Sequence, residues 1–552
     1  MDFWNRPLSE VTICTSNTQS LLGLTDEQGC AQIEVPEGSE IILTLFNRQS
    51  RIVRVNTSRI EVRLSDKDRL FDIGYDERIR KSESTASLSQ AVSEDIQASG
   101  NTTVMNNLYG LIPGLGVYQG SNLPWDNSPS LYVRGQGSFG GNQVLVLVDG
   151  IERDMAQISP KEVESITVLK DAASLALYGN RGADGVVVIT TKRGGDHGLR
   201  SQIDYNFGVQ TPFRIPHMAD GYTYASAVNE ALSNDGLSPR YTMHDMRLIA
   251  GHMHPQLFPD IDWQALILRK VAFTHDVNLT FDGKGQRIRY FVYANYNSNR
   301  GFLNNTEMND GYSTQIGMDA LKVRSNIEAR LTKSTVARIN LMGRLMQYQH
   351  PSAGTNLSGM YDTPAAAFYP LAPQSEGGGW VRSRLCKNPL ADLTSRGYNT
   401  VLQRTLFADL TIDQNLEMIT PGLSAQVRVA YDNSAEITDM RTCDFAYMEV
   451  SSANDEIGNV KELLYTPYGN NRKLSTSINR TSVWAKILYD RKFGAHGISA
   501  RLIFNENRSD YRGANNSYMY RDGIVSVGYN YDSRYLFNAV LTYAGASQMP
   551  AG

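Results

Sequence analysis

The chain has 552 residues, of which 41% are hydrophobic and 20% charged, and its formal net charge is -4. This composition is too apolar for a disordered chain, and the slightly acidic balance gives no electrostatic basis for binding nucleic acid. The length allows about three domains of ~150 residues each. No run of ~18 apolar residues occurs, so no transmembrane helix is expected.

The chain shows neither a targeting signal nor a cysteine framework. Its first residues, MDFWNRPLSEV, have no basic region followed by an apolar one, so no signal peptide is evident. The four cysteines are scattered without a CxxC motif, at Cys14, Cys30, Cys386 and Cys443. They indicate no metal site, and two alternatives stay open for the first pair, a disulfide or two small buried thiols.

Residues 1–64 are predicted to form a small all-β domain, a sandwich that starts at about Pro7. Short runs rich in Val, Ile and Leu alternate with turn clusters such as Thr25–Gly29 and Pro36–Gly38. The predicted strands are Val11–Thr15, Ala31–Val35, Ile41–Phe46, Ile52–Val55 and Ile60–Leu64. This segment holds no nucleophile–base pair and no ligand cluster, so we expect a spacer or docking module.

Residues 65–101 are predicted to be a linker, because they are rich in Ser, Asp, Glu, Lys and Arg and show no apolar periodicity. One apolar island interrupts them. It consists of Leu70, Phe71, Asp72, Ile73, Gly74 and Tyr75. This island is either an ordinary linker turn or an extended strand to which a partner adds a strand of its own.

Residues 102–197 are predicted to form a small α+β unit. Three apolar runs, Val144–Val148, Ile166–Leu169 and Val186–Ile189, have the length and composition of buried strands. The amphipathic pieces Ser159–Val163 and Asp171–Leu177 between them are expected to be short helices. A further short helix at Asn106–Ile112 and strands at Gly116–Gln119 and Ser130–Arg134 are expected before them.

Two features of this unit suggest chemistry that the residues do not support. Gly135–Gly140 matches G-x-G-x-x-G, but a strand follows it, and a dinucleotide site needs a helix N-terminus there. The carboxylates Asp149, Glu152 and Asp154 lack a nearby histidine that could serve as a general base. We interpret the glycines as a tight loop, Asp149 as part of a turn, and the other two carboxylates as solvated. No enzyme site, cofactor or metal is expected.

From residue 198 onward the chain alternates apolar and polar residues with a period of two, as in Ile203, Tyr205, Phe207 and Val209. The further runs lie at 271–281, 288–296, 323–331, 335–347, 402–413, 422–433, 478–491, 496–507 and 523–544. They predict roughly ten or eleven strands, each close to the ~9–11 residues that cross a bilayer. Tight turns such as Gly283–Gly285 alternate with long polar loops. We therefore favour a membrane β-barrel with a wet, charged lumen over a soluble sandwich.

These strands are about half of a ~22-stranded barrel, the size whose lumen is plugged. An open sheet edge in lipid is costly. We therefore expect residues 198–552 to be a partial barrel and the chain to be the N-terminal portion of a longer protein. The alternative is that the strands close a smaller barrel.

The α+β unit resembles the plug of SusC/RagA-type TonB-dependent outer-membrane transporters. The matching stretches are Ser130–Gly135, Val146–Gly150, Ile158–Ser174 and Tyr178–Lys192. The plug-signature residues within or beside them are Arg134, Gly135, Asp149, Gly150, Lys170, Asp171, Tyr178, Gly179, Arg181, Gly182 and Gly185. Residues 1–64 resemble the carboxypeptidase-regulatory-like extension of such chains. The island at 70–75 stands in the place of the TonB box, although only its Ile-Gly-Tyr core matches the family pattern.

The resemblance implies active import of a glycan or peptide across the bacterial outer membrane, without covalent chemistry. The implied partners are TonB, which pairs with the island at 70–75, a SusD-like surface lipoprotein, and outer-membrane lipid. A siderophore or vitamin receptor, or a surface β-protein without transport, are the alternatives. Among loop aromatic residues, Tyr361, Tyr369 and Trp380 are candidates for stacking on sugar rings.

Overall fold

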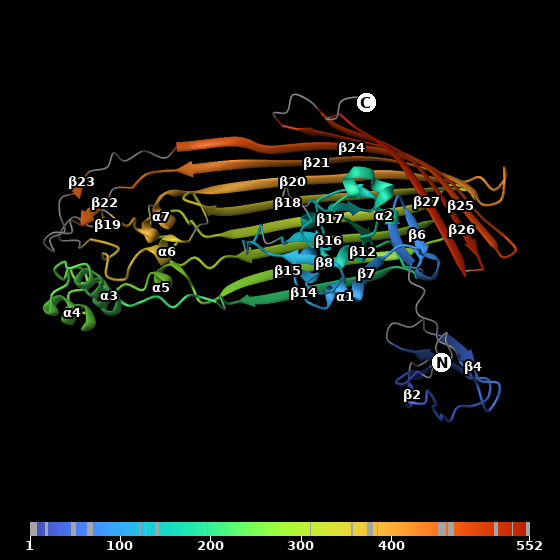
Figure 1. Ribbon diagram of the computed structural model, residues 1–552, viewed down its shortest axis with the longest axis horizontal. Helices are drawn as coiled ribbons and strands as arrows, with labels where there is room; N and C mark the ends of the chain where they lie inside the picture. Colours follow the sequence, from blue (N-terminus) through green and yellow to red (C-terminus); the bar gives the residue numbers. More distant parts are fainter. Residues whose placement is uncertain are drawn as a thin grey trace.

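The computed structural model describes residues 8–16, 20–45, 51–62, 70–121, 123–126, 128–137, 143–195, 197–212, 214–309, 311–354, 357–372, 379–383, 385–445, 447–450, 460–461, 469–512, 517–532 and 534–547. Figure 1 shows a small N-terminal sheet, a compact central unit, and a large curved sheet that wraps around this unit. Segments between the large strands gather at one end of the sheet.

The N-terminal segment forms one four-stranded antiparallel sheet around Val11, Ile13, Ile41 and Leu43. Its strands, in the order β2-β1-β3-β4, are β1 (Thr12–Thr15), β2 (Leu21–Leu24), β3 (Glu40–Thr44) and β4 (Arg51–Arg54). The predicted strand at 31–35 is wrong, because Ile33 and Val35 pack on the core from a segment outside the sheet. Cys14 and Cys30 form no disulfide.

The central unit is built on a five-stranded sheet with the order β11-β10-β13-β12-β7. Its strands are β7 (Leu88–Val92), β10 (Leu145–Val148), β11 (Ile151–Glu152), β12 (Val163–Leu169) and β13 (Val186–Thr191). The strands β12 and β13 are buried along almost their whole length, which explains their continuous apolar sequence. The two predicted helical pieces lie where expected, as η4 (Pro160–Glu162) and α2 (Ala172–Leu175).

Smaller elements complete the central unit. They are β5 (Leu70–Gly74), β6 (Glu77–Arg80), η1 (Lys81–Glu83), α1 (Ser93–Gln97), η2 (Val104–Asn107), β8 (Leu115–Tyr118), β9 (Ser130–Val133), η3 (Met155–Gln157) and η5 (Ala176–Gly182). One apolar cluster, with Ile96, Leu108 and Val168, fills one face of the sheet. A second, with Leu147 and Val188, joins the other face to Trp484 and Ile503 of the large sheet.

The segment predicted as a linker, 65–101, differs from the prediction over its described part. The strand β7 pairs with β12 and so belongs to the central sheet, while β5 and β6 form a hairpin packed against it. Few apolar residues suffice for this, because Ala91 and Ile96 are fully buried and polar contacts hold the hairpin. Low apolar content concealed an ordered segment.

The large sheet has eleven strands, each antiparallel to its neighbours, as the alternation predicts. They are β14 (Arg200–Gln210), β15 (Ala272–Lys284), β16 (Ile288–Arg300), β17 (Gly317–Arg330), β18 (Thr335–Pro351), β20 (Gly397–Asn415), β21 (Leu423–Thr442), β24 (Gly469–Phe493), β25 (His496–Tyr511), β26 (Tyr518–Tyr531) and β27 (Tyr535–Ala546). The apolar set faces outward: Ile203 is 74% exposed and Val323 47%. Several strands run on into predicted loops, and β24 reaches 25 residues.

The long connections are not simply polar loops, because several pack together at one end of the sheet around Trp263, Phe368 and Leu390. They carry α3 (Gly221–Asn234), α4 (Met243–Ala250), α5 (Trp263–Ile267), α6 (Gly359–Asp362), β19 (Trp380–Ser383), α7 (Pro389–Ser395), β22 (Tyr447–Val450) and β23 (Val460–Lys461). Across the described ranges, no helix combines the length and the apolar character needed to cross a membrane.

Candidate functional site: the interface between the central unit and the large sheet

The concave face of the large sheet meets the central unit through buried charges. Alternation along β17 points Val323 outward and turns Lys322 and Arg324 inward, where they are 6% and 1% exposed. The sequence predicted a wet lumen for this face. Where Lys322 and Arg324 meet the central unit, both are buried and paired with that unit.

Glu162 at the end of η4 is the first anchor. Its carboxylate lies between Lys322 Nζ, 2.7 Å away, and the Arg324 guanidinium, and it also accepts a hydrogen bond from the backbone N–H of Ser159. Burial raises the pKa of Glu162, but the two cations outweigh it and lower that pKa to about 2. Glu162 is therefore ionised and binds the central unit to β17.

Arg153, which follows β11, is the second anchor. Its Nε and Nη2 each donate to Asp432 at 2.9 Å, and its Nη1 donates to Asp409 at 3.1 Å. The guanidinium also lies 4.8 Å from the ring centroid of Phe407. One buried arginine is thus held by two carboxylates of the large sheet, a charge-assisted and partly bidentate arrangement.

Glu152 belongs to a third anchor. It forms ion pairs with Arg181 of η5 and with Arg480 of β24, the latter at 3.1 Å. The alternation of charges along an extended edge suggested exposure, and the Glu152 side chain is indeed 33% exposed. What the sequence did not indicate is that the large sheet supplies Arg480 as a counter-charge.

The hairpin of β5 and β6 contains the island that resembles the TonB box. Its two-residue turn, Tyr75 and Asp76, has φ of +50° and +55°, the geometry of a type I′ turn. Tyrosine in this region of backbone space is costly. The Tyr75 ring is held by stacking on Tyr178, 5.5 Å between centroids, and by an edge contact with Trp484.

Further contacts bind the hairpin to the central unit. The hydroxyl of Tyr178 donates to the carbonyl of Ile73 at 2.6 Å. Asp72 accepts hydrogen bonds from Thr190 Oγ1 and from the N–H of Gly74, both at 2.9 Å. Burial raises the pKa of Asp72 despite these hydrogen bonds.

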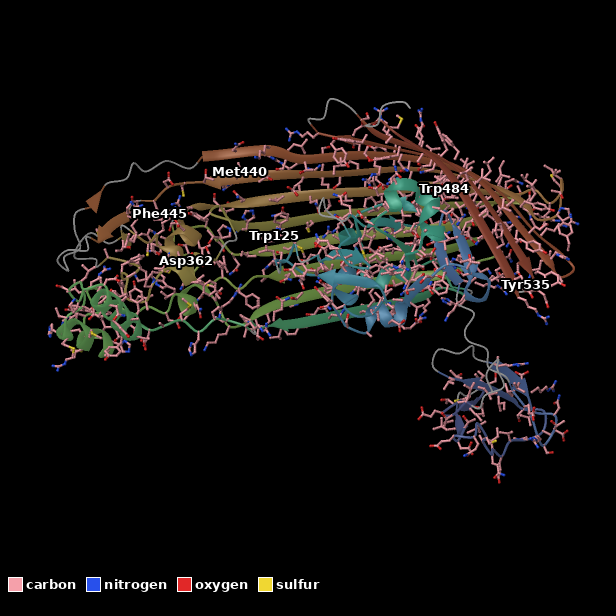
Figure 2. The ribbon with its side chains drawn as sticks, viewed as in Figure 1. Trp125, Asp362, Met440, Phe445, Trp484 and Tyr535 are labelled. Carbon is pink, nitrogen blue, oxygen red and sulfur yellow. The ribbon has the colours of Figure 1, made fainter. Side chains whose placement is uncertain are left out.

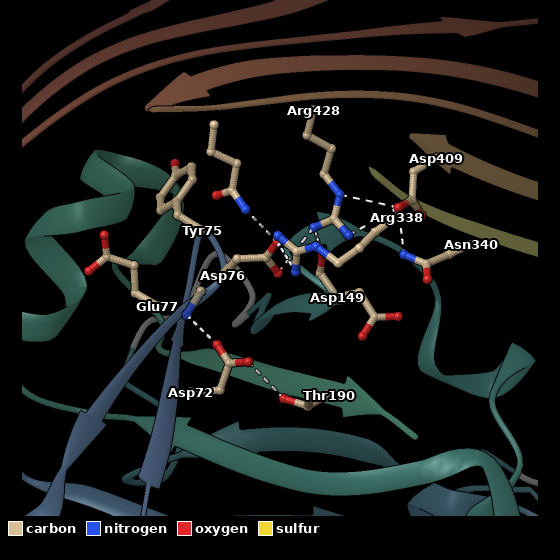
Figure 3. Close-up of polar contacts among 12 residues, drawn as sticks. Asp72, Tyr75, Asp76, Glu77, Asp149, Thr190, Arg338, Asn340, Asp409 and Arg428 are labelled. Carbon is tan, nitrogen blue, oxygen red and sulfur yellow. Dashed lines mark hydrogen bonds and ion pairs between the residues drawn. The ribbon is translucent and has the colours of Figure 1, made fainter. Parts of the chain in front are cut away.

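Figure 3 shows how the hairpin turn meets the large sheet. Asp76 pairs with Arg338 of β18 at 3.0 Å and with Arg428 of β21 at 3.5 Å. Although burial raises the pKa of Asp76, these arginines lower it well below its usual range. Glu77 lies 3.4 Å from Lys486, whose ammonium also donates to the carbonyl of Tyr75 at 2.9 Å. The hairpin is therefore bound to both the central unit and the large sheet.

Gly74 permits the docked position of this hairpin. Its φ is +90°, and a Cβ at this residue would lie 1.7 Å from the Tyr178 hydroxyl oxygen. We expect Gly74→Ala to weaken the hairpin by about 2 kcal/mol, from backbone strain and loss of the Tyr178 hydrogen bond. Faster proteolysis within residues 70–80 would measure this. Adding Tyr178→Phe to Gly74→Ala should restore part of the protection, and no restoration would contradict the steric explanation.

Two adjoining cavities separate the central unit from the sheet. The larger, of about 940 Å³, is lined by Arg153, Arg181 and Asp432 together with tyrosines of β25 and β26. The smaller, of about 320 Å³, lies beside Trp125, whose ring stacks on Tyr348 of β18 at 4.5 Å. Both share lining residues from η3 and β20. Together they form one chamber, and charged side chains stand in its wall beside apolar ones.

The cavities and the hairpin lie at successive levels of the same strands. On β21 the hairpin meets Gln426 and Arg428, and the larger cavity begins at Asp432 and reaches Glu436. A strand rises ~3.3 Å per residue, so Arg428 and Asp432 are about 13 Å apart along it. The chamber is on the side where β21 leads to the packed connections.

Two plug-signature residues hold the central unit together. Asp149, at the turn between β10 and β11, accepts hydrogen bonds from the backbone N–H and hydroxyl of Thr191 at 2.9 and 2.8 Å. Lys170 donates to Ser89 Oγ at 2.6 Å and to the carbonyl of Pro113 at 2.9 Å. Both side chains are structural ties.

The other signature residues shape local turns, apart from Tyr178 and Arg181, described above. Asp171 caps α2 by accepting a hydrogen bond from the N–H of Ser174 at 2.9 Å. Gly185 has φ of +98°, and a Cβ there would lie 2.5 Å from Val133 Cβ. The remainder lie in turns or in η5: Arg134, Gly135, Gly150, Gly179 and Gly182. Part of the glycine loop, 138–142, is outside the described residues.

The loop aromatic residues proposed for sugar stacking are not among the residues that line the chamber. Trp380 is only 9% exposed and packs against Phe445 in the apolar cluster of the connections, and Tyr361 packs on the same cluster. Figure 2 shows Phe445 at this end of the molecule and Trp484 at the level of the plug. Tyr369 is half-buried nearby in sequence. The indole of Trp380 contributes to packing.

Sequence reasoning missed the charged residues that make the interface. These are Asp76, Glu77, Arg153, Glu162, Lys322, Arg324, Arg338, Asp409, Arg428, Asp432, Arg480, Lys486 and Arg501. A signal existed for the sheet residues, since they fall on the polar phase of the alternation. Their partners could not be read, because pairs such as Arg428 and Asp76 are separated by 352 positions.

The central unit of the chain is similar to the plug domains of TonB-dependent receptors. Residues 80–186 match the family model described as the TonB-dependent Receptor Plug Domain. The chain is 29% identical to TonB-dependent receptor P26 of Formosa agariphila over 321 residues, 56% of this chain and 30% of that protein. It is 25% identical to TonB-dependent receptor SusC of Bacteroides thetaiotaomicron over 296 residues, 51% of this chain and 28% of that protein.

The solved structure of the RagAB peptide transporter has the same fold. Its TM-score is 0.65 at 16% identity, with 84% of this chain and 56% of that chain covered. The predicted resemblance to SusC/RagA-type TonB-dependent transporters and the predicted plug-and-barrel fold are therefore confirmed. The chain spans about a third of the length of the curated relatives it matches.

Proposed function

We propose that the protein is an outer-membrane importer that takes a polar nutrient through the lumen under the control of TonB. The observation that carries this proposal is the arrangement of the interface. The chamber, whose larger cavity is about 940 Å³, lies on one side of the plug, and the docked hairpin 70–80 lies at the next level of the same strands. Gated transport needs a ligand site and a segment that a partner can pull, both on the same plug.

The segment that TonB would pull is the strand β5. Extended segments bind partners by adding a strand, and TonB would pair with residues 70–75 once the hairpin leaves the plug. The apolar outer face, with Ile203 and Leu541 each over 70% exposed, suits contact with lipid and supports placement in the outer membrane. The charged side chains in the wall of the chamber support a glycan or peptide as cargo.

A SusD-like surface lipoprotein is the proposed partner at the opposite end. The packed connections supply a broad structured surface there, and two helices, α3 and α4, carry exposed apolar side chains such as Tyr222 and Met243. The similarity to SusC and to the RagAB peptide transporter supports this class of cargo and partner.

The test is growth of the source bacterium on single nutrients. A strain lacking this gene should lose growth on one group of oligosaccharides or peptides and keep growth on the corresponding monomers. Deleting TonB should cause the same loss, and a matched strain with Arg521→Met, an exposed ion-pair residue, should grow normally. Uptake that persists without TonB would overturn the proposal.

A further inference from the structure

A chain of buried charges joins the wall of the larger cavity to the docked hairpin. At the cavity end, Arg153 and Asp432 both line the chamber and are bound to each other through two hydrogen bonds of 2.9 Å. The third arm of the Arg153 guanidinium reaches Asp409 at 3.1 Å. Anything that draws Arg153 into the chamber therefore acts on Asp409.

Asp409 is shared between two arginines. Its Oδ2 accepts from Arg153, and its Oδ1 accepts from Arg428 at 3.0 Å and from Asn340 at 2.7 Å. The carboxylate has no exposed surface. Charges in such a site are poorly screened. If one arginine is lost, Asp409 therefore attracts the remaining arginine more strongly.

Arg428 divides its donors among three parts of the molecule. It binds Asp409 of the sheet, the carbonyl of Asp149 in the plug, and Asp76 in the hairpin turn. The contact with Asp76 is the longest, at 3.5 Å, against 3.0 Å for Asp409. When Arg428 moves closer to Asp409, its contact with Asp76 in the hairpin is the one that weakens.

We propose that Asp409 and Arg428 are positioning residues that couple the cavity to the hairpin. Withdrawal of Arg153 from Asp409 pulls Arg428 away from Asp76 and loosens the hairpin. This inference rests on the proposed function, since it gives a route by which cargo in the chamber frees the TonB-binding strand. By linkage the coupling is reciprocal: a detached hairpin changes the affinity of the chamber by the same factor.

The coupling can be measured without any cargo, by the reactivity of a thiol in the hairpin. Ile73 is buried in β5, so Ile73→Cys in a protein whose four native cysteines are replaced by serine reacts only when the hairpin opens. We expect Arg153→Gln to raise the rate of maleimide labelling at position 73 by about tenfold, a usual size for coupling between sites. Arg153→Lys, which keeps the charge and loses the forked geometry, should raise it less.

Two variants separate coupling from general loosening. Lys322→Gln breaks an equally buried bond between plug and sheet that does not touch the hairpin, and it should leave labelling nearly unchanged. In Arg153→Gln/Asp409→Asn the carboxylate that draws Arg428 away from the hairpin is gone, Arg428 is released to Asp76, and labelling should return toward the parental rate. Equal acceleration by Arg153→Gln and Lys322→Gln, or a double variant as fast as Arg153→Gln alone, would overturn the coupling.

If Arg153→Gln does not fold, Arg153→Lys carries the same comparison with Lys322→Gln. Because labelling needs neither cargo nor TonB, its result is independent of the growth test. If labelling shows the coupling but growth does not depend on TonB, the inference about these residues stands and the proposed function is wrong. If growth depends on TonB but labelling shows no coupling, the proposed function stands and the inference is wrong.

Discussion

Replacing Arg428 by methionine is expected to lower the free energy of unfolding by about 3–5 kcal/mol, the usual cost of breaking a buried ion pair from one side. The guanidinium is fully buried and faces Asp76, Asp409 and the carbonyl of Asp149. Methionine has a similar length and fills the space, so the loss is one of charge and hydrogen bonds. Asp409 keeps Arg153, whereas the hairpin loses one of its two arginines.

The measurement is urea unfolding of the purified protein in detergent, followed by tryptophan fluorescence, because Trp484 lies beside the Tyr75 ring at this interface. The control is Arg521→Met, which removes an arginine that is 61% exposed and pairs with Glu506 on β25. This change should cost less than about 1 kcal/mol. Equal effects of the two substitutions would show that the interface charges do not hold the plug.

The strands of the large sheet were predictable because every second residue is apolar and points to the outer face. Ile203 and Val323 belong to this apolar set, and both are exposed on the outer face. The connections were predicted less well. Their average composition is polar, and this concealed scattered residues such as Phe368 and Trp380 that the fold gathers into one cluster. An aromatic residue in a polar segment, such as Trp380, suggested a ligand contact, but in the structure it packs within the apolar cluster.

The interface was beyond prediction from sequence for a different reason. Lys322 is recognisable as an inward residue, but whether it meets water or Glu162 depends on the level at which the plug sits. The hairpin posed a similar difficulty, since Tyr75 and Asp76 lack the Asn-Gly signature of a type I′ turn. Their positive φ values are imposed by tertiary contacts with Tyr178 and the arginines of the sheet. Tertiary contacts, not local preference, determine both features.

Acid is expected to remove the anchor at Glu162, and the sign follows from its pKa. Burial raises the pKa of Glu162, Lys322 and Arg324 lower it, and the result in the folded protein is about 2, below the ordinary 4.5. A carboxyl with a lowered folded pKa stabilises the fold fully above its unfolded value. That stability, a few kcal/mol, is lost as the pH falls from about 4.5 toward 2.

The variant Glu162→Gln isolates this contribution, because the amide oxygen can still accept the N–H of Ser159 while the negative charge is gone. At pH 7 the free energy of unfolding of the variant should be about 3–5 kcal/mol lower, since Lys322 remains buried without its counter-charge and Arg324 keeps only Asp149, 3.8 Å away. As the pH is lowered below 4.5 the parental protein loses the same charge, so the difference between the two urea curves should shrink and nearly vanish near pH 2. Glu506→Gln, which neutralises a partly exposed carboxylate, should change stability little at any pH. A difference between parent and Glu162→Gln that stays constant from pH 7 to pH 3 would mean that shape, and not charge, is what Glu162 contributes to holding the plug.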